Sequence, residues 1–188
     1  MASLRERLSA LEAALTAPDG RISAYHDLPF AIFHYMPEEE LTLRKQAGQL
    51  ARRLEHAHGK RVMEISLAAL MFEAIEQAAG MTALAEAEHT SGLTKTIETI
   101  HAILTDHMPL DQMVAERLSD MDPGRTVAFL TRAGALFPAF RTSSLLERLM
   151  GKAHVPTVLF YPGTLEGTVG LRFMGVLEAD HNYRPKIF

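Results

Sequence analysis

The chain has 188 residues, 47% of them hydrophobic, and this length predicts one compact domain over residues 1–188. Its net charge of −4 provides no overall positive field to hold a polyanion, so direct nucleic-acid binding is not expected. The absence of cysteine excludes disulfides, zinc–thiolate sites and thiol catalysis. No apolar run reaches the roughly 18 residues of a membrane span, and the amino terminus lacks the apolar core of a signal peptide. We therefore expect a soluble cytoplasmic protein that does not contact membranes.

The first part of the chain predicts a helix, a strand and a second helix. Residues 3–16 place leucines at spacings of three and four, which is typical of an amphipathic helix. The second half of residues 28–35 is predicted to be the first buried strand. Pro37 and the acidic residues after it indicate a helix start, and this helix should reach about Ala57. The side chains expected to face inward from it are Leu41, Leu50 and Leu54.

A second strand and helix follow, and then a long stretch with little β character. Residues 61–66 predict a brief strand, and Ser66 is a suitable cap for a helix over 67–79. Residues 80–122 are predicted to form about three helical pieces, as a helical insertion or a lid. The breaks between these pieces are expected at Gly80, Gly92 and Pro109.

The segment from Arg125 to Gly163 predicts the βαβ unit that anchors the fold. Thr126–Leu130 and Val155–Tyr161 are near-continuous apolar runs, typical of strands that are covered on both faces. Roughly two dozen residues separate them, which suffices for a crossover helix, and both strands are expected to end in sharp turns. With a last strand near 170–174 and a polar tail from Ala179, the sequence predicts an α/β fold. Its mainly parallel sheet should have about four or five strands with helices on both faces.

No sequence motif for catalysis or metal binding is present. The turn after Leu130 lacks the lysine and the glycine spacing of a P-loop, so Gly134 is expected to act as a structural pivot. The nine histidines show no HExxH spacing, and no serine lies in a GxSxG elbow. His34 alone is expected near the carboxyl edge of the sheet, where a structural role is the more common one. We therefore predict a protein that is not an enzyme and has no cofactor and no metal site.

Arginines and tyrosines beside the predicted turns are the remaining candidates. Their planar side chains lose little entropy on contact, which is why protein interfaces favour them. The predicted partner-binding residues are Arg132, Arg141, Tyr161, Arg172, Tyr183 and Arg184. The structural alternative is that Arg132 and Arg141 tie their loops to helix carboxylates such as Glu147.

The order and spacing of these motifs resemble the BrxB family of BREX bacteriophage-defence systems. The motifs are Arg132–Pro138 with Arg141, Val155–Gly163, Leu171–Met174 and Asn182–Arg184, together with Phe33–Tyr35 and Arg61–Leu70 upstream. The resemblance covers nearly the whole chain. It implies a small cytoplasmic accessory protein that works alongside an ATPase, a DNA methyltransferase and the alkaline-phosphatase-like protein PglZ. It supplies no catalytic residue, and its implied role is association with other BREX proteins, of which PglZ is the preferred partner.

Two other functions stay open on the sequence alone. A degenerate nucleotide-binding or nucleic-acid-binding role is suggested by the strand–turn–helix geometry at Gly134 and by one basic helix face. That face carries Arg44, Lys45, Arg52 and Arg53. An enzyme would have to use His34 and Tyr35 at the sheet edge. An open carboxyl edge with convergent polar groups would favour a ligand site, whereas an edge filled by Phe137, Tyr161 and the tail would favour an interaction role.

Overall fold

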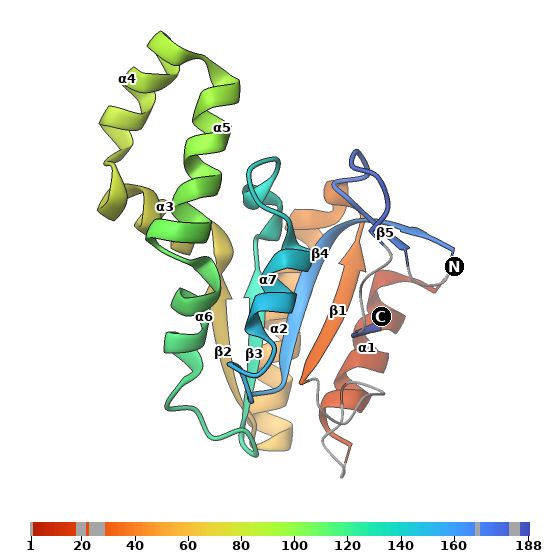
Figure 1. Cartoon of the computed structure of the whole chain (residues 1–188). Helices are drawn as coiled ribbons and strands as arrows, with labels where there is room; N and C mark the ends of the chain where they lie inside the picture. Colours follow the sequence, from red (N-terminus) through yellow and green to blue (C-terminus); the bar gives the residue numbers. More distant parts are fainter. Residues whose placement is uncertain (1, 18–21, 23–28, 168–169, 181–184) are drawn as a thin grey trace.

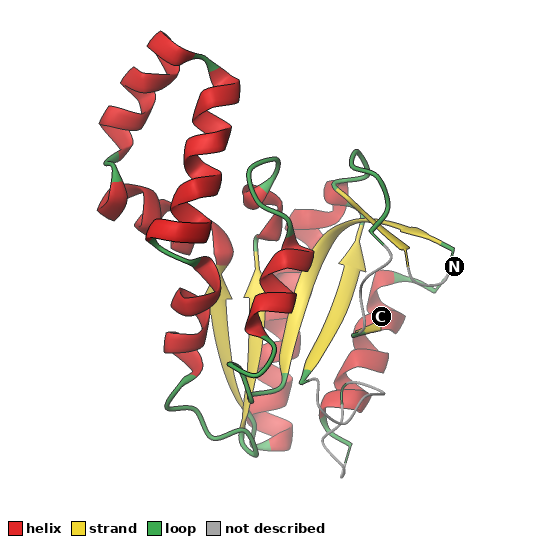
Figure 2. Ribbon diagram, in the orientation of Figure 1, coloured by secondary structure: helices red, strands yellow, loops and turns green. Residues whose placement is uncertain are grey.

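A single, mostly parallel β-sheet with helices on both faces forms the centre of the molecule (Figures 1 and 2). The computed structural model describes residues 2–17, 22, 29–167, 170–180 and 185–188. The strands are β1 (Phe30–Tyr35), β2 (Arg61–Ser66), β3 (Thr126–Thr131), β4 (Thr157–Glu166), β5 (Gly170–Phe173) and β6 (Lys186–Ile187). Their order is β2-β3-β4-β1-β6, all parallel, and β5 pairs antiparallel with the end of β4. The predicted α/β class and mainly parallel sheet are confirmed.

The helices follow the sequence prediction closely. They are α1 (Leu4–Leu15), α2 (Glu40–His58), α3 (Leu67–Ala78), α4 (Met81–Ser91), α5 (Leu93–Ala102), α6 (Leu110–Leu118) and α7 (Thr142–Leu149). Short 3-10 turns, η1 (Pro37–Glu39) and η3 (Ala133–Leu136), precede α2 and α7, and a π-helical turn, η2 (Ile103–His107), extends α5. Ser66 caps α3 as predicted, because its hydroxyl accepts the Ala69 amide at 3.2 Å.

Two apolar layers cover the faces of the sheet. Helices α1 and α2 pack on one face, where Ala31, Phe33 and Tyr35 of β1 point toward them. Helices α3, α6 and α7 pack on the other face, against Phe30 and Ile32. This alternation follows from the two-residue repeat of a strand. Because both faces are covered, the central strands must be apolar on both sides, as the sequence indicated.

The inward stripe of α2 differs from the prediction at its first residue. Leu50 and Leu54 are buried, but Leu41 is 76% exposed. The stripe begins instead at Leu43 and continues through Ala47, at helical spacings of four and three. Leu41 lies two residues before Leu43, which places it on the opposite side of the helix.

The expected sharp turn after Tyr161 is wrong, because β4 continues through Pro162 and Gly163 to Glu166. Pro162 pairs with Tyr35, the last residue of β1. A proline has no amide hydrogen to donate, but the β1–β4 ladder ends at this pair, so no later hydrogen bond between the two strands is lost. A Cβ at Gly163 would collide with the Arg172 carbonyl oxygen of β5 and lie 2.6 Å from the Tyr161 ring. A glycine is therefore required at position 163, where β4 stops pairing with β1 and begins to pair with β5.

The carboxyl-terminal residues form a strand that the sequence analysis predicted only as a polar tail. β6 pairs with β1 through Ala31↔Lys186 and Ile32↔Ile187. Its position is fixed by residues far away in sequence: the Arg7 guanidinium donates to the His34 carbonyl oxygen at 2.8 Å, and the His34 ring nitrogen Nδ1 lies 2.8 Å from the Phe188 oxygen. α1 and β6 therefore meet at the same edge of the sheet.

Helices α4 and α5, residues 81–102, project away from the sheet as a pair that we call the α4–α5 arm (Figure 1). Gly80 and Gly92, with φ values of 81° and 82°, provide the two backbone breaks. Together with η2 and α6, the arm makes residues 80–122 a mainly helical segment, as predicted. Within the part of the chain that the structure describes, no single helix is long and apolar enough to cross a membrane; α3 and α4 meet the length and composition criteria only together, as a pair bent by 83°.

Candidate functional site at the carboxyl edge of the sheet

The turn that follows β3 pivots on an arginine. Arg132 has φ 58° and ψ 36°, in the left-handed region that non-glycine residues seldom adopt. Gly134, the expected pivot, lies inside η3 and has no positive φ. The backbone reverses at Arg132 so that η3 can pack Ala133 and Leu136 into the core. The Arg132 side chain consequently stays exposed at the carboxyl edge.

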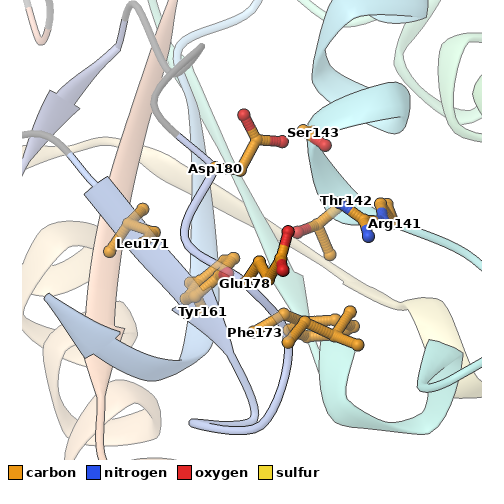
Figure 3. A pocket seen from close by; sticks show the side chains of 9 residues that line it. Arg141, Thr142, Ser143, Tyr161, Leu171, Phe173, Glu178 and Asp180 are labelled. Carbon is orange, nitrogen blue, oxygen red and sulfur yellow. The ribbon is translucent and has the colours of Figure 1, made fainter. Parts of the chain in front are cut away.

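A small pocket lies beside this turn, between the start of α7 and the segment after β5 (Figure 3). Its volume of about 10 Å³ is close to the room that one water molecule needs. The rings of Tyr161 and Phe173 line this pocket with their centroids 5.4 Å apart, and Phe137 packs against Phe173 with a centroid distance of 6.0 Å. The edge is therefore filled largely by the chain's own side chains.

Two carboxylates, those of Glu178 and Asp180, lie in this pocket with Thr142 and Ser143 at the first turn of α7 (Figure 3). A helix start carries a partial positive charge and free amides, and in many nucleotide-binding folds it receives a phosphate. Here the chain places its own negative groups beside that position. An antiparallel bridge between Leu171 and Asp180, with amide–carbonyl distances of 3.0 and 3.1 Å, fixes the segment that carries them.

The structure brings only some of the predicted partner-binding residues together. Arg141 is exposed and lines the small pocket, whereas Tyr161 is fully buried at its base and supports the wall. Arg172 projects from the other side of β5, where its Nη1 lies 3.6 Å from Glu166 and its Nε donates to the Leu177 carbonyl oxygen at 3.3 Å. Tyr183 and Arg184 lie outside the described residues. Their partner-binding role stays a prediction.

The alternative of an ion pair to Glu147 is not seen. Within the described ranges, neither Arg132 nor Arg141 forms a salt bridge. Both guanidinium groups therefore face solvent at the carboxyl edge, on either side of η3. Exposed arginines that pair with no described carboxylate of their own chain are candidates to bind one in another molecule.

Arg132 also borders a polar cluster on the α2 side of the sheet. There the Tyr35 hydroxyl donates to Glu40, Arg44 pairs with Glu40 at 2.6 Å, and Thr131 donates to Glu64 at 3.1 Å. Burial and the hydrogen bond to the Glu40 carboxylate both raise the pKa of Tyr35, which keeps the phenol neutral. These groups satisfy one another, and the cluster fixes the start of α2 on the ends of β1 and β3.

His34 and Tyr35 do not form a catalytic pair in this geometry. They are consecutive residues of β1, so their side chains point to opposite faces of the sheet. The Arg7 guanidinium lies 3.2 Å from the His34 ring nitrogens. Burial, and next the Arg7 charge, lower the pKa of His34, which favours the neutral ring that holds the Phe188 oxygen. His34 thus has a structural role.

Carboxylates offset part of the basic face of α2. Arg44 pairs with Glu40, and Arg53 pairs with Glu12 of α1 at 2.8 Å. Lys45 and Arg52 form no salt bridge with any described residue. The groove between α1 and α2, about 800 Å³, is therefore lined by mixed rather than uniformly positive charge.

The sequence analysis missed a group of exposed apolar side chains beside the α4–α5 arm. Phe72, Met81 and Leu93 are 40–62% exposed and line a common groove. One feature of the sequence could have indicated this group: the first two turns of α3 are almost wholly apolar. A helix that is apolar on all sides is normally buried on all sides, so the exposure of Phe72 is unexpected for a core helix.

Comparison with known proteins identifies the family. The family model described as BREX protein BrxB matches residues 63–187, which is more than half of the chain. A curated relative, BREX protein BrxB of Bacillus cereus (strain H3081.97), is 26% identical over 160 residues, covering 85% of this chain and 82% of the relative. No solved structure matches the chain. In the described part of the chain, no group of three or more His, Asp or Glu side chains is placed to hold a metal ion. The chain belongs to the BrxB family of BREX proteins.

Proposed function

We propose that this protein is a non-catalytic interaction component of a BREX system in the cytoplasm, and that it docks on a larger component, with PglZ as the preferred partner. The observation that supports the proposal is the filled carboxyl edge. In an open α/β sheet this edge is where a substrate would bind. Here Tyr161, Phe173 and Phe137 occupy part of it, and the two small pockets that the described residues form at this edge, of about 10 and 20 Å³, have room for little more than water.

The groups around the filled edge suit protein contact better than chemistry. Arg132 and Arg141 are exposed on both sides of η3, and Arg172 is 43% exposed on β5. Arginine forks bind carboxylates with two parallel hydrogen bonds and lose little entropy in doing so. The proposed docking surface therefore consists of Arg132 and Arg141, with Tyr161 and the aromatic rings as its rigid support, and Arg172 on the other side of β5 is a second, separate candidate contact.

Co-purification tests this proposal. The tagged chain is expressed with the complete defence operon, and the retained BREX components are compared for the wild type, Arg141→Glu and Arg172→Glu. Both charge reversals should reduce retention by about tenfold or more, because placing like charges against each other at an interface costs several kcal/mol. Arg52→Glu, an exposed change on α2, is the matched control and should bind as the wild type does. Retention of no BREX component by the wild type would refute the proposal.

Arg132 allows a cleaner variant. Glycine adopts its left-handed φ of 58° without steric cost, so Arg132→Gly removes the guanidinium while keeping the turn. We expect an unchanged thermal unfolding midpoint to within a few degrees and weaker docking. Equal docking of Arg132→Gly and the wild type would remove Arg132 from the interface.

The nucleotide or nucleic-acid alternative is tested on the same purified protein. The carboxylates of Glu178 and Asp180 beside the start of α7 disfavour a phosphate there, and half of the basic residues on α2 are already paired. Calorimetry with ATP should show no heat of binding. Binding to DNA at low ionic strength that weakens steeply with salt would instead favour the alternative.

A further inference from the structure

An apolar groove of about 290 Å³ lies where the α4–α5 arm meets the body of the protein. Its walls come from α3, α4 and α5, and its floor comes from residues 135–139 of the η3 loop. The lining is almost entirely apolar, and Glu88 is its only charged residue among those described. The same loop carries Arg132 and Arg141 at its ends, so the groove adjoins the proposed docking surface.

Exposed apolar side chains gather in this groove. Of the eight large apolar side chains that are exposed in the described residues, three line it: Phe72 at 50%, Met81 at 40% and Leu93 at 62%. Ile97 and Ile100 of α5 are half-buried beside them. Single exposed apolar residues are ordinary on a protein surface, but a contiguous group of them around a groove marks a contact site.

The charge around the groove is one-sided. Helices α3 to α5, residues 67–102, contain five glutamates and one lysine, a balance of −4 that equals the net charge of the whole chain. Lys95 pairs with Glu98 at 2.7 Å, and Glu73 pairs with Arg117 at 2.6 Å. Glu86 and Glu88 on α4 have no salt bridge to a described residue. A ligand for this groove should therefore carry basic groups beside apolar ones.

The backbone of the walls selects the conformation of that ligand. Helices satisfy their own amides and carbonyls, so the helical walls give an extended peptide no partner for its backbone groups. A helix brings its own hydrogen bonds and presents only side chains, as in other helix-in-groove complexes. We propose that the groove binds an amphipathic helix of a partner BREX protein, with lysine or arginine next to its apolar stripe. This inference rests on the proposed function and names a second contact surface for it.

A photo-crosslinking amino acid at Leu93 tests the proposal directly. It is introduced into the full chain in cells that carry the complete defence operon, and the crosslinked peptide is identified by mass spectrometry. Met150, 40% exposed at the far end of α7, is the matched control position. We expect a crosslink from Leu93, and not from Met150, to a BREX component, in a segment with helical apolar spacing and adjacent basic residues. A crosslink to an acidic or non-helical segment would overturn the proposal.

A second copy of this chain is the competing occupant, because α2 carries the exposed Leu41 beside Arg44 and Lys45. A crosslink from Leu93 to α2 of another copy, together with a dimer in light scattering, would replace the partner helix by self-association. A monomer at all concentrations, with the crosslink to another BREX component, supports the proposal.

Two substitution pairs measure the contribution of each feature. Leu93→Gln and Phe72→Gln should weaken binding to the purified partner complex by about tenfold or more, the effect of losing an apolar anchor, whereas Met150→Gln should leave it unchanged. Glu86→Lys with Glu88→Lys should weaken binding mainly at low salt. Thermal unfolding by circular dichroism verifies that each variant folds.

The outcomes separate this inference from the proposed function. Wild-type protein that retains partners, with groove variants that retain them equally, overturns the groove and leaves the docking role standing. Wild-type protein that retains no BREX component refutes the docking role itself.

Discussion

Every residue of β3 is buried, whereas in the α4–α5 arm only Leu84 and Thr96 are. Both regions are rich in apolar residues, but β3 lies between two packed helical layers and the arm has a covered side only at its base. Apolar burial stabilises the sheet by about 25 cal/mol per Å² of area removed from water, and exposed residues contribute little of this. The comparison teaches that the fold explains the hydrophobicity of the sheet but not that of the arm.

The largest expected effect is the loss of a core side chain in the sheet. Leu159 of β4 is fully buried between β1 and β3. Leu159→Ala should reduce the free energy of unfolding by about 2–5 kcal/mol, because the transfer energy and the cavity both count. Urea denaturation followed by circular dichroism measures this. A reduction of less than about 1 kcal/mol would show that the sheet core is loosely packed and that burial does not distinguish the sheet from the arm.

A smaller loss of stability is expected from breaking the ion pair between Asp111 of α6 and Lys152, which follows α7. The Lys152 ammonium lies 2.5 Å from Asp111, whose carboxylate is 3% exposed while Lys152 is 46% exposed. Lys152→Met should cost about 2 kcal/mol, less than a fully buried pair, because solvent already screens the lysine. The double variant Asp111→Asn with Lys152→Met should recover part of this in the same denaturation assay. A double variant less stable than Lys152→Met alone would contradict the account.

A pH effect is expected where α1 and β6 meet the edge of the sheet. The folded protein lowers the pKa of His34, by burial first and by the Arg7 charge second, while the hydrogen bond to the Phe188 backbone and the Glu39 charge act in the opposite direction. The unfolded chain therefore binds the proton more readily. The stabilisation is present above about pH 6.5 and is lost as the pH falls toward the folded-state pKa. The free energy of unfolding of the wild type should fall between pH 7.5 and 5, and more steeply than that of His34→Gln. Parallel pH profiles would show that His34 does not titrate on unfolding.

Local patterns predicted most of the fold. The β2 strand and its Ser66 cap, the breaks at Gly80 and Gly92, and the two covered strands of the βαβ unit all follow from spacing and residue type, and the structure confirms them. These features depend on residues that are close to one another in the sequence. The strand β6 does not: it is fixed by Arg7 and His34, more than 150 residues away. Pairings of that length leave no periodic trace in a sequence.

The candidate site was predicted less completely, for a similar reason. The exposed positions of Arg132 and Arg141 follow from the turn that separates them from the core. The burial of Tyr161 depends on β4 passing straight through Pro162 and Gly163, which only the partner strands β1 and β5 determine. The placement of Glu178 and Asp180 at the start of α7 likewise depends on a bridge across the sheet end. Residue type indicated the candidates, and tertiary pairing decided which of them face solvent.

The smallest expected effect completes the comparison with a matched leucine in the arm. Leu93 is 62% exposed at the start of α5, so Leu93→Ala removes little buried area and retains a good helix former. The free energy of unfolding should change by no more than about 0.5 kcal/mol, as for other surface substitutions, against several kcal/mol for Leu159→Ala in the same urea assay. A loss of more than about 2 kcal/mol in the free energy of unfolding would mean that the arm folds back over Leu93 in solution. The groove would then be part of the buried core and closed to a partner. A cost near zero would mean that Leu93 contributes little to folding, as expected if the groove that it lines with Phe72 and Met81 serves contact with another molecule.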